Sequence, residues 1–379
     1  MIEPVHSTAV LLIIAVAAVV LLLFMIMKLK IHAFVALIFV SVVTAVAAGI
    51  PVYTADPNGV DIGKAITTGF AGVLGSVALL VGLGVMLTVL AGILLFQDAV
   101  VRDTARYRAV RLAFLSATVV FLGLYAGAQL SVVNVVTFAH ALLTGFRWDL
   151  FLLDPLVFVL WSFVAIALVF WGRGAYCGWL CPFGALQELS NRLAKLARIP
   201  QWTLPWGLHE RLWAVKYIIF LGLFGVTLAS VDQAERLAEV EPFKTAIVLK
   251  FDRAWPFTLY AMVLLGIGLF VERFYCRYLC PLGAALAIPA RLRMFDWLKR
   301  YPECGRPCQT CANECMVQAI HPTGEINPNE CHNCLHCQVL YQSEQKCPVV
   351  ILKKKKRDAF AKRNAASSEA MERVITNKH

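Results

Sequence analysis

The sequence predicts a mainly α-helical, polytopic membrane protein with a small cysteine-rich α+β domain near its C-terminal end. Three observations lead to this fold class. Of the 379 residues, 59% are hydrophobic and only 16% are charged, which indicates that lipid surrounds most of the chain. Long apolar stretches recur between residues 10 and 271, and all twelve cysteines follow residue 176. Cysteines gathered in this way favour metal or redox sites over an extracellular disulfide framework.

Seven apolar stretches could cross a bilayer, because a spanning helix needs roughly 20 mostly apolar residues. They lie near residues 10–27, 32–52, 70–96, 112–130, 156–171, 213–230 and 254–271. Lys216 interrupts the sixth stretch, and we expect its ammonium group to extend towards the membrane surface. The stretch from 131 to 150 is aromatic and amphipathic, which predicts a segment that rests on the outer membrane surface.

The charged residues predict the orientation of these spans. Basic residues gather at 28–30, 102–111, 173–198 and 273–300, and the positive-inside rule places that side in the cytoplasm. Acidic residues mark the other side, namely Asp56, Asp61, Asp232, Glu235, Glu239 and Glu241. The N-terminus is then expected outside and the cysteine-rich end inside. The net charge of +11 suits contact with anionic membrane lipid, and no nucleic-acid partner is expected.

A repeated motif suggests that one helical hairpin occurs twice. The segment YCGWLCPFGA at 176–185 is matched by YCRYLCPLGA at 275–284, each at the cytoplasmic end of a predicted span. Each copy holds one Cys-x3-Cys-Pro pair, Cys177 with Cys181 and Cys276 with Cys280. Cysteines at i and i+4 share a helix face, so each pair could bind a soft metal or form a thiol–disulfide couple. A structural role at a helix start is the alternative, and the matching placement favours the functional interpretation.

The remaining eight cysteines form two runs typical of two-cluster ferredoxins. The first run is Cys304-x3-Cys308-x2-Cys311-x3-Cys315, and the second is Cys331-x2-Cys334-x2-Cys337-x9-Cys347-Pro348. Thiolates hold cubane iron, and in such ferredoxins the fourth cysteine of each run ligates the other cluster. One 4Fe–4S cluster would therefore take Cys304, Cys308, Cys311 and Cys347, and the other Cys331, Cys334, Cys337 and Cys315. Residues 318–320 and 324–327 predict the short helix, turn and strand of a ferredoxin half.

Other interpretations of this region stay open. Four thiolates also suit a structural zinc ion, although two similar runs, the second closed by Cys-Pro, favour paired iron–sulfur clusters. The x3 gap between Cys304 and Cys308 departs from the usual x2 spacing. His321, His332 and His336 are expected to be solvated loop residues, because the cysteines already fill both clusters. The basic run 353–357 either attracts lipid headgroups or belongs to a solvated tail, and we expect the tail.

From about residue 88 onward the sequence resembles the membrane and polyferredoxin part of the NosR family, and more loosely the NapH-type membrane ferredoxins. The resemblance rests on YAGAQLSVVN at 125–134, CGWLCPFGALQE at 177–188, the second Cys-x3-Cys-Pro pair and CQTCANECM at 308–316. It implies a protein of the bacterial inner membrane that supplies electrons to nitrous oxide reductase, a periplasmic copper enzyme, or supports its maturation with accessory proteins. NosR proteins begin with a flavin-binding domain, and we expect no FMN domain in this chain.

Residues 1–87 resemble instead the start of a GntP-type gluconate permease, in HAFVAL at 32–37 and GFAGVLGSVALLVGLG at 69–84. The sequence is thus interpreted as a fusion. We expect a three-span permease-like segment at 1–87, a NosR-like membrane domain with two hairpins at 88–300, a ferredoxin-like domain with two clusters at 301–352 and a basic disordered tail at 353–379. With about three spans, the first segment is not expected to transport gluconate.

The residues and the resemblance together predict an electron-transfer component, with no catalytic residue assigned. Its electron donor is expected to be quinol, a cytoplasmic ferredoxin or a flavoprotein. A redox-sensing regulator of nitrous oxide reductase expression is the alternative, and a permease fragment is a weaker one.

Overall fold

The computed structural model describes residues 8–29, 33–49, 62–144, 155–230, 233, 236–306 and 308–376. Within these ranges the regular elements are helices, and pairing between extended segments is limited to isolated bridges. The mainly helical fold class is thereby confirmed. The chain divides into two compact units, Met1–Val81 and Gly82–His379, which are described separately.

The first unit contains two apolar helices and the start of a third. Helix α1 (Thr8–Met27) packs on α2 (Ala33–Ala47) through Met25, Ala36 and Val40. Many of the other described side chains of these helices are apolar and exposed, which suits contact with lipid. Helix α3 (Ile62–Leu95) begins in this unit and continues into the second.

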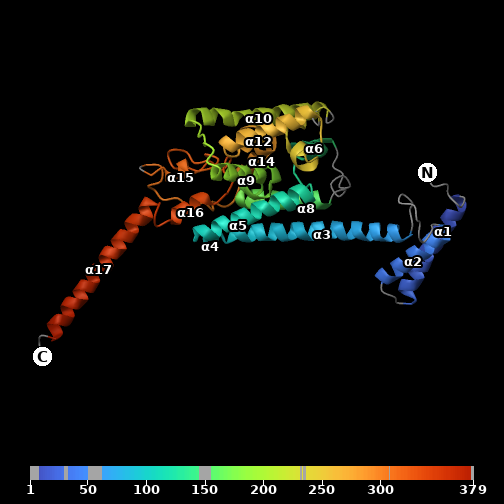
Figure 1. The fold of residues 1–379 in the computed structure, drawn as a ribbon, viewed down its shortest axis with the longest axis horizontal. Coiled ribbons are helices and arrows are strands. Elements are labelled where there is room, and N and C mark those ends of the chain that lie inside the picture. The colour runs from blue at the N-terminus through green and yellow to red at the C-terminus, as the bar shows by residue number, and fades with distance from the viewer. Residues whose placement is uncertain are drawn as a thin grey trace. The chain divides into compact units, whose positions relative to one another are not determined.

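The second unit is a helical bundle with a cysteine-rich extension (Figure 1). Its first elements after α3 are α4 (Gln97–Val101), α5 (Thr104–Ala117), the π-helical η1 (Thr118–Tyr125) and α6 (Val132–Thr144). Two hairpins of one design follow, formed by α8 (Pro155–Trp171), η2 (Tyr176–Leu180) and α9 (Pro182–Leu196), and by α12 (Trp255–Phe270), α13 (Phe274–Tyr278) and α14 (Pro281–Ala287). Between the hairpins lie α10 (Trp206–Ala229), η3 (Ala238–Val240) and η4 (Lys244–Val248), and η5 (Pro289–Leu292) follows them. The extension holds α15 (Thr310–Asn313), α16 (His336–Gln342) and α17 (Pro348–Thr376).

The two hairpins begin their second helices in the same way. A cysteine caps each helix and a proline follows it: the Sγ of Cys181 accepts the Gly184 N–H at 3.4 Å, and that of Cys280 accepts the Gly283 N–H at 3.3 Å. Proline suits the first helical position because it has no N–H to satisfy. The hairpins also pack on each other, since α9 contacts α12, and α8 contacts η5, which follows the second hairpin. In Figure 1, α9 lies between α5 and α12.

Each of the seven predicted spans contains an apolar helix, and three of these helices are long and apolar enough to cross a membrane. They are Thr67–Leu95, Thr104–Tyr125 and Trp206–Ala229. The other four predicted spans form shorter apolar helices, of which Pro155–Trp171 and Trp255–Phe270 belong to the hairpins. Asp56, Asp61, Asp232 and Glu235, predicted to mark the outer side, lie outside the described residues.

Helix α6 lies in the stretch predicted to rest on the outer membrane surface. It packs against α10 and α14, with Val132 and Val136 buried, because its apolar face finds partners within the bundle. The aromatic residues Phe146 and Trp148 of the same predicted segment lie outside the described residues.

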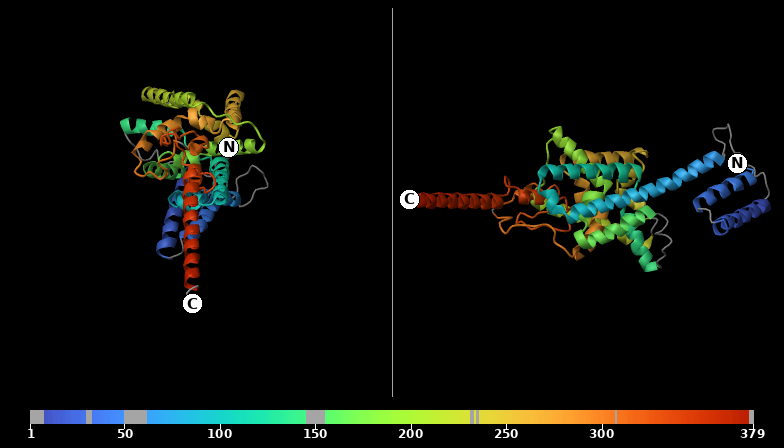
Figure 2. Two further views of the ribbon diagram at one scale, coloured as in Figure 1. Left: turned by 90° about the vertical axis from the view of Figure 1, so that its left-hand side faces the viewer. Right: turned by 90° about the horizontal axis from the view of Figure 1, so that it is seen from below.

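Two parts of the extension differ from their predictions. The predicted helix, turn and strand of a ferredoxin half are represented by a single antiparallel bridge between Ile320 and Ile326. Where a disordered tail was expected from residue 353, the structure has α17, a helix rich in the strong helix formers Ala, Lys, Arg and Glu. Figure 2 shows α17 leaving the bundle as one continuous helix.

Candidate iron–sulfur sites

The structure gathers the eight C-terminal cysteines around two cavities. Cys304, Cys308, Cys311 and Cys347 line the first cavity, and Cys315, Cys331, Cys334 and Cys337 line the second cavity. Each cavity combines three cysteines of one run with one cysteine of the other. This grouping is the one that the cysteine spacing predicts for two clusters.

A tight turn absorbs the extra residue between Cys304 and Cys308. Gly305 has a φ of 104°, a conformation that glycine adopts without strain, and its N–H donates to the Cys308 carbonyl at 2.7 Å. A Cβ at position 305 would lie 1.8 Å from the Thr323 carbonyl oxygen. The x3 spacing is therefore compatible with both cysteines facing the first cavity.

Burial controls the ionisation of the cavity thiols. It raises the pKa of the Cys311 thiol to about 11 and that of the Cys331 thiol to about 12. Iron binds thiolates, so metal binding must displace protons that these buried thiols hold at neutral pH.

The arrangement of the thiols fits a cubane better than a single ion. Across the part of the chain that the structure describes, no three His, Cys, Asp or Glu side chains are grouped so that they could hold one metal ion. A zinc site would need four ligands at about 2.0 to 2.3 Å from one centre. A cubane is held by one thiolate at each iron, so its ligands surround a volume, as the cysteines do in both cavities.

The loop that lines the second cavity is hydrogen-bonded to α5 and to the first hairpin. The hydroxyl of Tyr107 donates to the Cys334 carbonyl at 2.7 Å, and Nε1 of Trp179 donates to the Asn333 carbonyl at 2.9 Å. Gly178 permits this approach, because a Cβ at that position would lie 1.8 Å from the His332 carbonyl oxygen. The loop that carries Cys331 and Cys334 is therefore seated directly on the Cys-x3-Cys-Pro motif.

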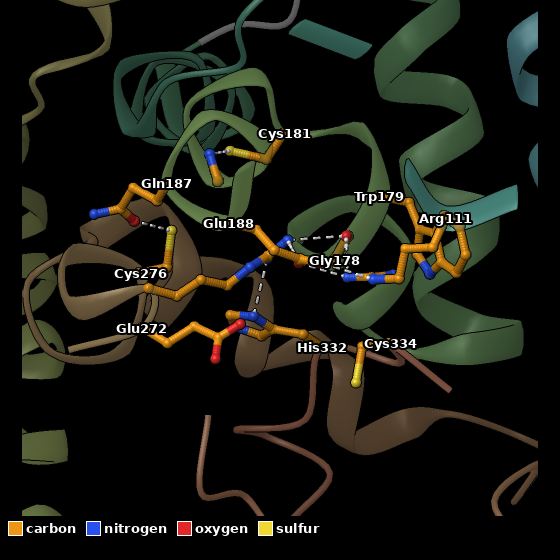
Figure 3. Close-up of polar contacts among 12 residues, drawn as sticks. Arg111, Gly178, Trp179, Cys181, Gln187, Glu188, Glu272, Cys276, His332 and Cys334 are labelled. Atoms are coloured by element: carbon orange, nitrogen blue, oxygen red, sulfur yellow. Dashed lines mark hydrogen bonds and ion pairs between the residues drawn. The ribbon is translucent and has the colours of Figure 1, made fainter. Parts of the chain in front are cut away.

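A buried carboxylate, Glu188 on α9, lies beside this loop (Figure 3). It accepts hydrogen bonds from Arg111 Nε at 2.9 Å and from Arg273 Nη2 at 2.7 Å. Burial opposes ionisation of Glu188, but the two guanidinium groups outweigh it and hold the pKa of this carboxyl well below its usual range. Arg273 Nη1 also lies 3.2 Å from His332 Nδ1. Burial and then Arg273 lower the pKa of His332 well below its usual value, so its neutral ring accepts this bond.

A second buried carboxylate, Glu330, directly precedes Cys331 and binds three groups of the membrane domain. Arg173 Nη2 and the Tyr217 hydroxyl each donate to it at 3.1 Å, and Lys216 Nζ also donates to it. The expectation that Lys216 extends to the membrane surface is wrong. Its side chain is 0% exposed, because Glu330 provides the counter-charge inside the protein.

Arg173 and Arg273 hold the two hairpins together. Arg173 stands four residues before Cys177 and Arg273 stands three residues before Cys276, and each reaches the other hairpin. Arg173 Nη1 donates to the Gly283 carbonyl at 2.9 Å, and Arg273 Nη1 donates to the Cys177 carbonyl at 2.6 Å. Each copy of the repeated motif is thus contacted by the arginine that precedes the other copy.

The four hairpin cysteines lie inside the bundle. Cys181, Cys276 and Cys280 are buried and Cys177 is half-buried. Besides the two helix caps, Cys276 Sγ donates to Gln187 Oε1 at 3.2 Å. Three of the four thiols therefore have polar protein partners.

The histidines near the cysteine runs have side-chain partners. His321 Nδ1 lies 2.7 Å from the Thr323 hydroxyl, and His336 Nε2 lies 3.1 Å from Glu314 Oε2. Both are at least partly accessible, whereas His332 was expected to be solvated and is 1% exposed, because Arg273 gives it a buried partner.

Sequence analysis missed the buried charged residues in and beside the contact between the cysteine-rich extension and the membrane domain. These residues are Arg111, Arg173, Glu188, Arg273 and Glu330. Two signals could have indicated them. Arginines stand before both copies of the repeated motif, and an acidic residue immediately precedes a predicted cluster ligand.

Comparison with known families relates several parts of the chain to known proteins. A family model described as a 4Fe-4S binding domain matches residues 153–200 and 254–300, once for each hairpin, and a NosR model matches residues 302–358. The regulatory protein NosR of Pseudomonas aeruginosa PAO1 is 60% identical over 271 residues, which are 72% of this chain and 38% of that relative. Another regulatory protein NosR of Pseudomonas aeruginosa is 67% identical over 82 residues, which are 22% of this chain and 82% of that relative. The chain belongs to the NosR family.

The start of the chain matches another family. Residues 10–96 match a model of GntP family permeases, so the predicted fusion is confirmed. The NosR-family part is also 28% identical over 226 residues to the putative electron transport protein YccM of Escherichia coli K12, a match that covers 58% of this chain and 60% of YccM. The chain spans 38% of the length of the first NosR relative. No solved structure matches it.

Proposed function

We propose that this NosR-family chain carries two 4Fe–4S clusters and transfers electrons at the cytoplasmic face of a bacterial inner membrane. The observation that supports this most directly is the grouping of eight thiols around two cavities, four to each. Cys304, Cys308, Cys311 and Cys347 would hold one cluster, and Cys315, Cys331, Cys334 and Cys337 the other. The clusters would supply the one-electron redox change, and the protein would supply thiolates and a fixed position on the membrane domain.

The membrane arrangement is part of the proposal. We infer seven spans with the N-terminus outside and the cysteine-rich extension in the cytoplasm. The supporting observations are an apolar helix in each of the seven predicted stretches and the basic residues that gather beside the hairpins and the extension. A reporter enzyme that works only in the cytoplasm should be active when it is fused to residue 379. A reporter that works only in the periplasm should be inactive at the same position.

We further propose that the electrons serve nitrous oxide reductase or its maturation, as the family resemblance implies. A redox-sensing role in the expression of that enzyme is the second candidate, because both NosR relatives are described as regulatory proteins. Strains carrying Cys311→Ala or Cys334→Ala separate the two roles. Electron transfer predicts lost reductase activity at normal reporter expression, whereas regulation predicts lost expression.

Anaerobic purification of the full chain tests the cluster assignment. We expect iron and acid-labile sulfide sufficient for two cubanes, and an electron paramagnetic resonance (EPR) signal after dithionite reduction. Cys311→Ala should remove the first cluster and Cys334→Ala the second. Zinc in place of iron and sulfide, or a reduced protein without a signal, would refute the assignment.

A metal or thiol–disulfide function of Cys177, Cys181, Cys276 and Cys280 remains a prediction, and the caps on α9 and α14 support a structural contribution. Serine preserves an N-cap acceptor, whereas loss of a cap costs about 1 kcal/mol. If capping is the whole role, Cys181→Ser should keep the stability and the electron transfer of the unmodified protein. Cys181→Ala should lose part of both. A redox or metal role predicts that both variants lose electron transfer.

A further inference from the structure

Buried positive charge exceeds buried negative charge around the second cavity. Five basic side chains of the membrane domain are at most 4% exposed: Arg111, Arg173, Lys216, Arg273 and Arg277. The buried carboxylates that pair with them among the described residues are two, Glu188 and Glu330. Glu241 is also buried but accepts hydrogen bonds from Ser131 and Val132 instead. Five cations against two carboxylates leave an excess of three positive charges.

These cations are connected to the loops that carry the cysteines of the second cavity. Arg173 and Lys216 bind Glu330, the residue before Cys331. Arg277 binds Gln318, whose N–H donates to the Cys315 carbonyl at 2.9 Å. Arg173, Lys216 and Arg277 are thus joined to the loops that carry the cysteines of the second cavity, although none of them lines the cavity itself.

The same arginines retain unused hydrogen-bonding capacity. Arg111 Nη1 and the Nε atoms of Arg173, Arg273 and Arg277 are buried without a hydrogen-bond partner among the described residues. Buried donors without partners and buried charges without counter-ions are both costly. The surroundings of the second cavity therefore suit an anionic occupant, and a cubane with four thiolates is an anion.

The first cavity has a different electrostatic environment. Lys346 lines it, is 54% exposed, and pairs with Glu314 at 2.8 Å. Lys353 lies 4.6 Å from the ring centre of Tyr301, another lining residue. Both lysines stand at the protein surface, where water and salt screen their charges, and the half-buried Arg300, which hydrogen-bonds Cys311, is the further cation at this cavity.

We propose that the buried cations make the second cluster the stronger electron acceptor, so that electrons pass inward from the first cavity to the second and on towards the membrane domain. Reduction adds one negative charge to a cluster, and net charge and hydrogen bonding set cluster potentials. Burial alone disfavours the added charge, and the excess cations, which act through the same low-dielectric surroundings, favour it. In this step a cluster held at the first cavity would lose one electron and a cluster held at the second would gain it, with no bond or proton transferred.

This inference rests on the proposed clusters and is tested by a potentiometric titration of the full chain, followed by EPR. Cys311→Ser and Cys334→Ser assign the two signals, and the second cluster is expected to have the higher midpoint potential. Lys216→Met removes one buried cation while Arg173 still pairs with Glu330. It should lower the potential of the second cluster and leave that of the first unchanged.

The matched control is Lys346→Met, which removes an exposed lysine at the first cavity and should leave the second cluster unmoved. If Lys216→Met prevents cluster assembly, Arg277→Gln provides a second variant that removes a buried cation. It should lower the potential of the second cluster in the same way. The inference would be overturned, with the clusters still in place, by equal potentials of the two clusters or by a higher potential of the first. It would also be overturned if the potential of the second cluster shifted no more in Lys216→Met than in the control. A protein without either cluster would instead refute the proposed function.

Discussion

At the residue scale, Glu330 links the cysteine-rich extension to the membrane domain, because it is the shared partner of Lys216 and Arg173. Glu330→Gln would leave two buried cations without a formal counter-charge. Breaking a buried ion pair in this way costs about 3 to 5 kcal/mol. We expect a correspondingly lower free energy of unfolding in detergent, measured with denaturant.

Glu344→Gln is the control for this variant, since Glu344 pairs with Lys354 at the surface and is 54% exposed. An exposed pair contributes at most about 1 kcal/mol. Similar losses in the two variants would contradict a special role for Glu330.

Glu241 predicts a pH dependence of stability. Burial raises the pKa of this carboxyl from 4.5 to about 7, against hydrogen bonds from Ser131, Val132 and Leu282. The folded protein therefore holds a proton that the unfolded chain releases, so stability should fall as pH rises from about 4.5 to 7, by at most about 3 kcal/mol. Unfolding measured across this range should show the decline, and Glu241→Gln should flatten it. An unchanged slope in the variant would assign the pH dependence to other groups.

At the element scale, the contact between η2 and the loop of the second cavity depends on the absence of a side chain at Gly178. Gly178→Ala would place a Cβ 1.8 Å from the His332 carbonyl oxygen, so the loop must move. We expect the protein to lose up to half of its iron while the first cluster persists, measured by iron analysis and EPR. Gly207→Ala on α10 adds a Cβ with no heavy atom within 4 Å and should retain full iron content.

Sequence patterns predicted the features that depend on residues close together along the chain. The apolar stretches became helices, and the cysteine spacing predicted which four thiols line each cavity, because cluster ligands follow short, regular intervals. Lys216 was misplaced because its partner Glu330 lies 114 residues away along the chain. The burial of α6 likewise depends on α10 and α14, which the pattern within α6 does not specify.

At the scale of the whole molecule, both cavities belong to the second unit, and the permease-like start belongs largely to the first. A chain that begins at Gly82 should therefore keep both clusters. We expect iron, sulfide and EPR signals equal to those of the full chain after purification from membranes. Loss of both clusters on this deletion would show that the first unit is needed for assembly.

The crossed grouping of cysteines also means that the two cavities are completed at different points along the chain. All four thiols of the cavity seated on the membrane domain lie before residue 338, whereas the other cavity needs Cys347 as well. A polypeptide truncated just after Cys337 would therefore keep every thiol of the former and lack one thiol of the latter.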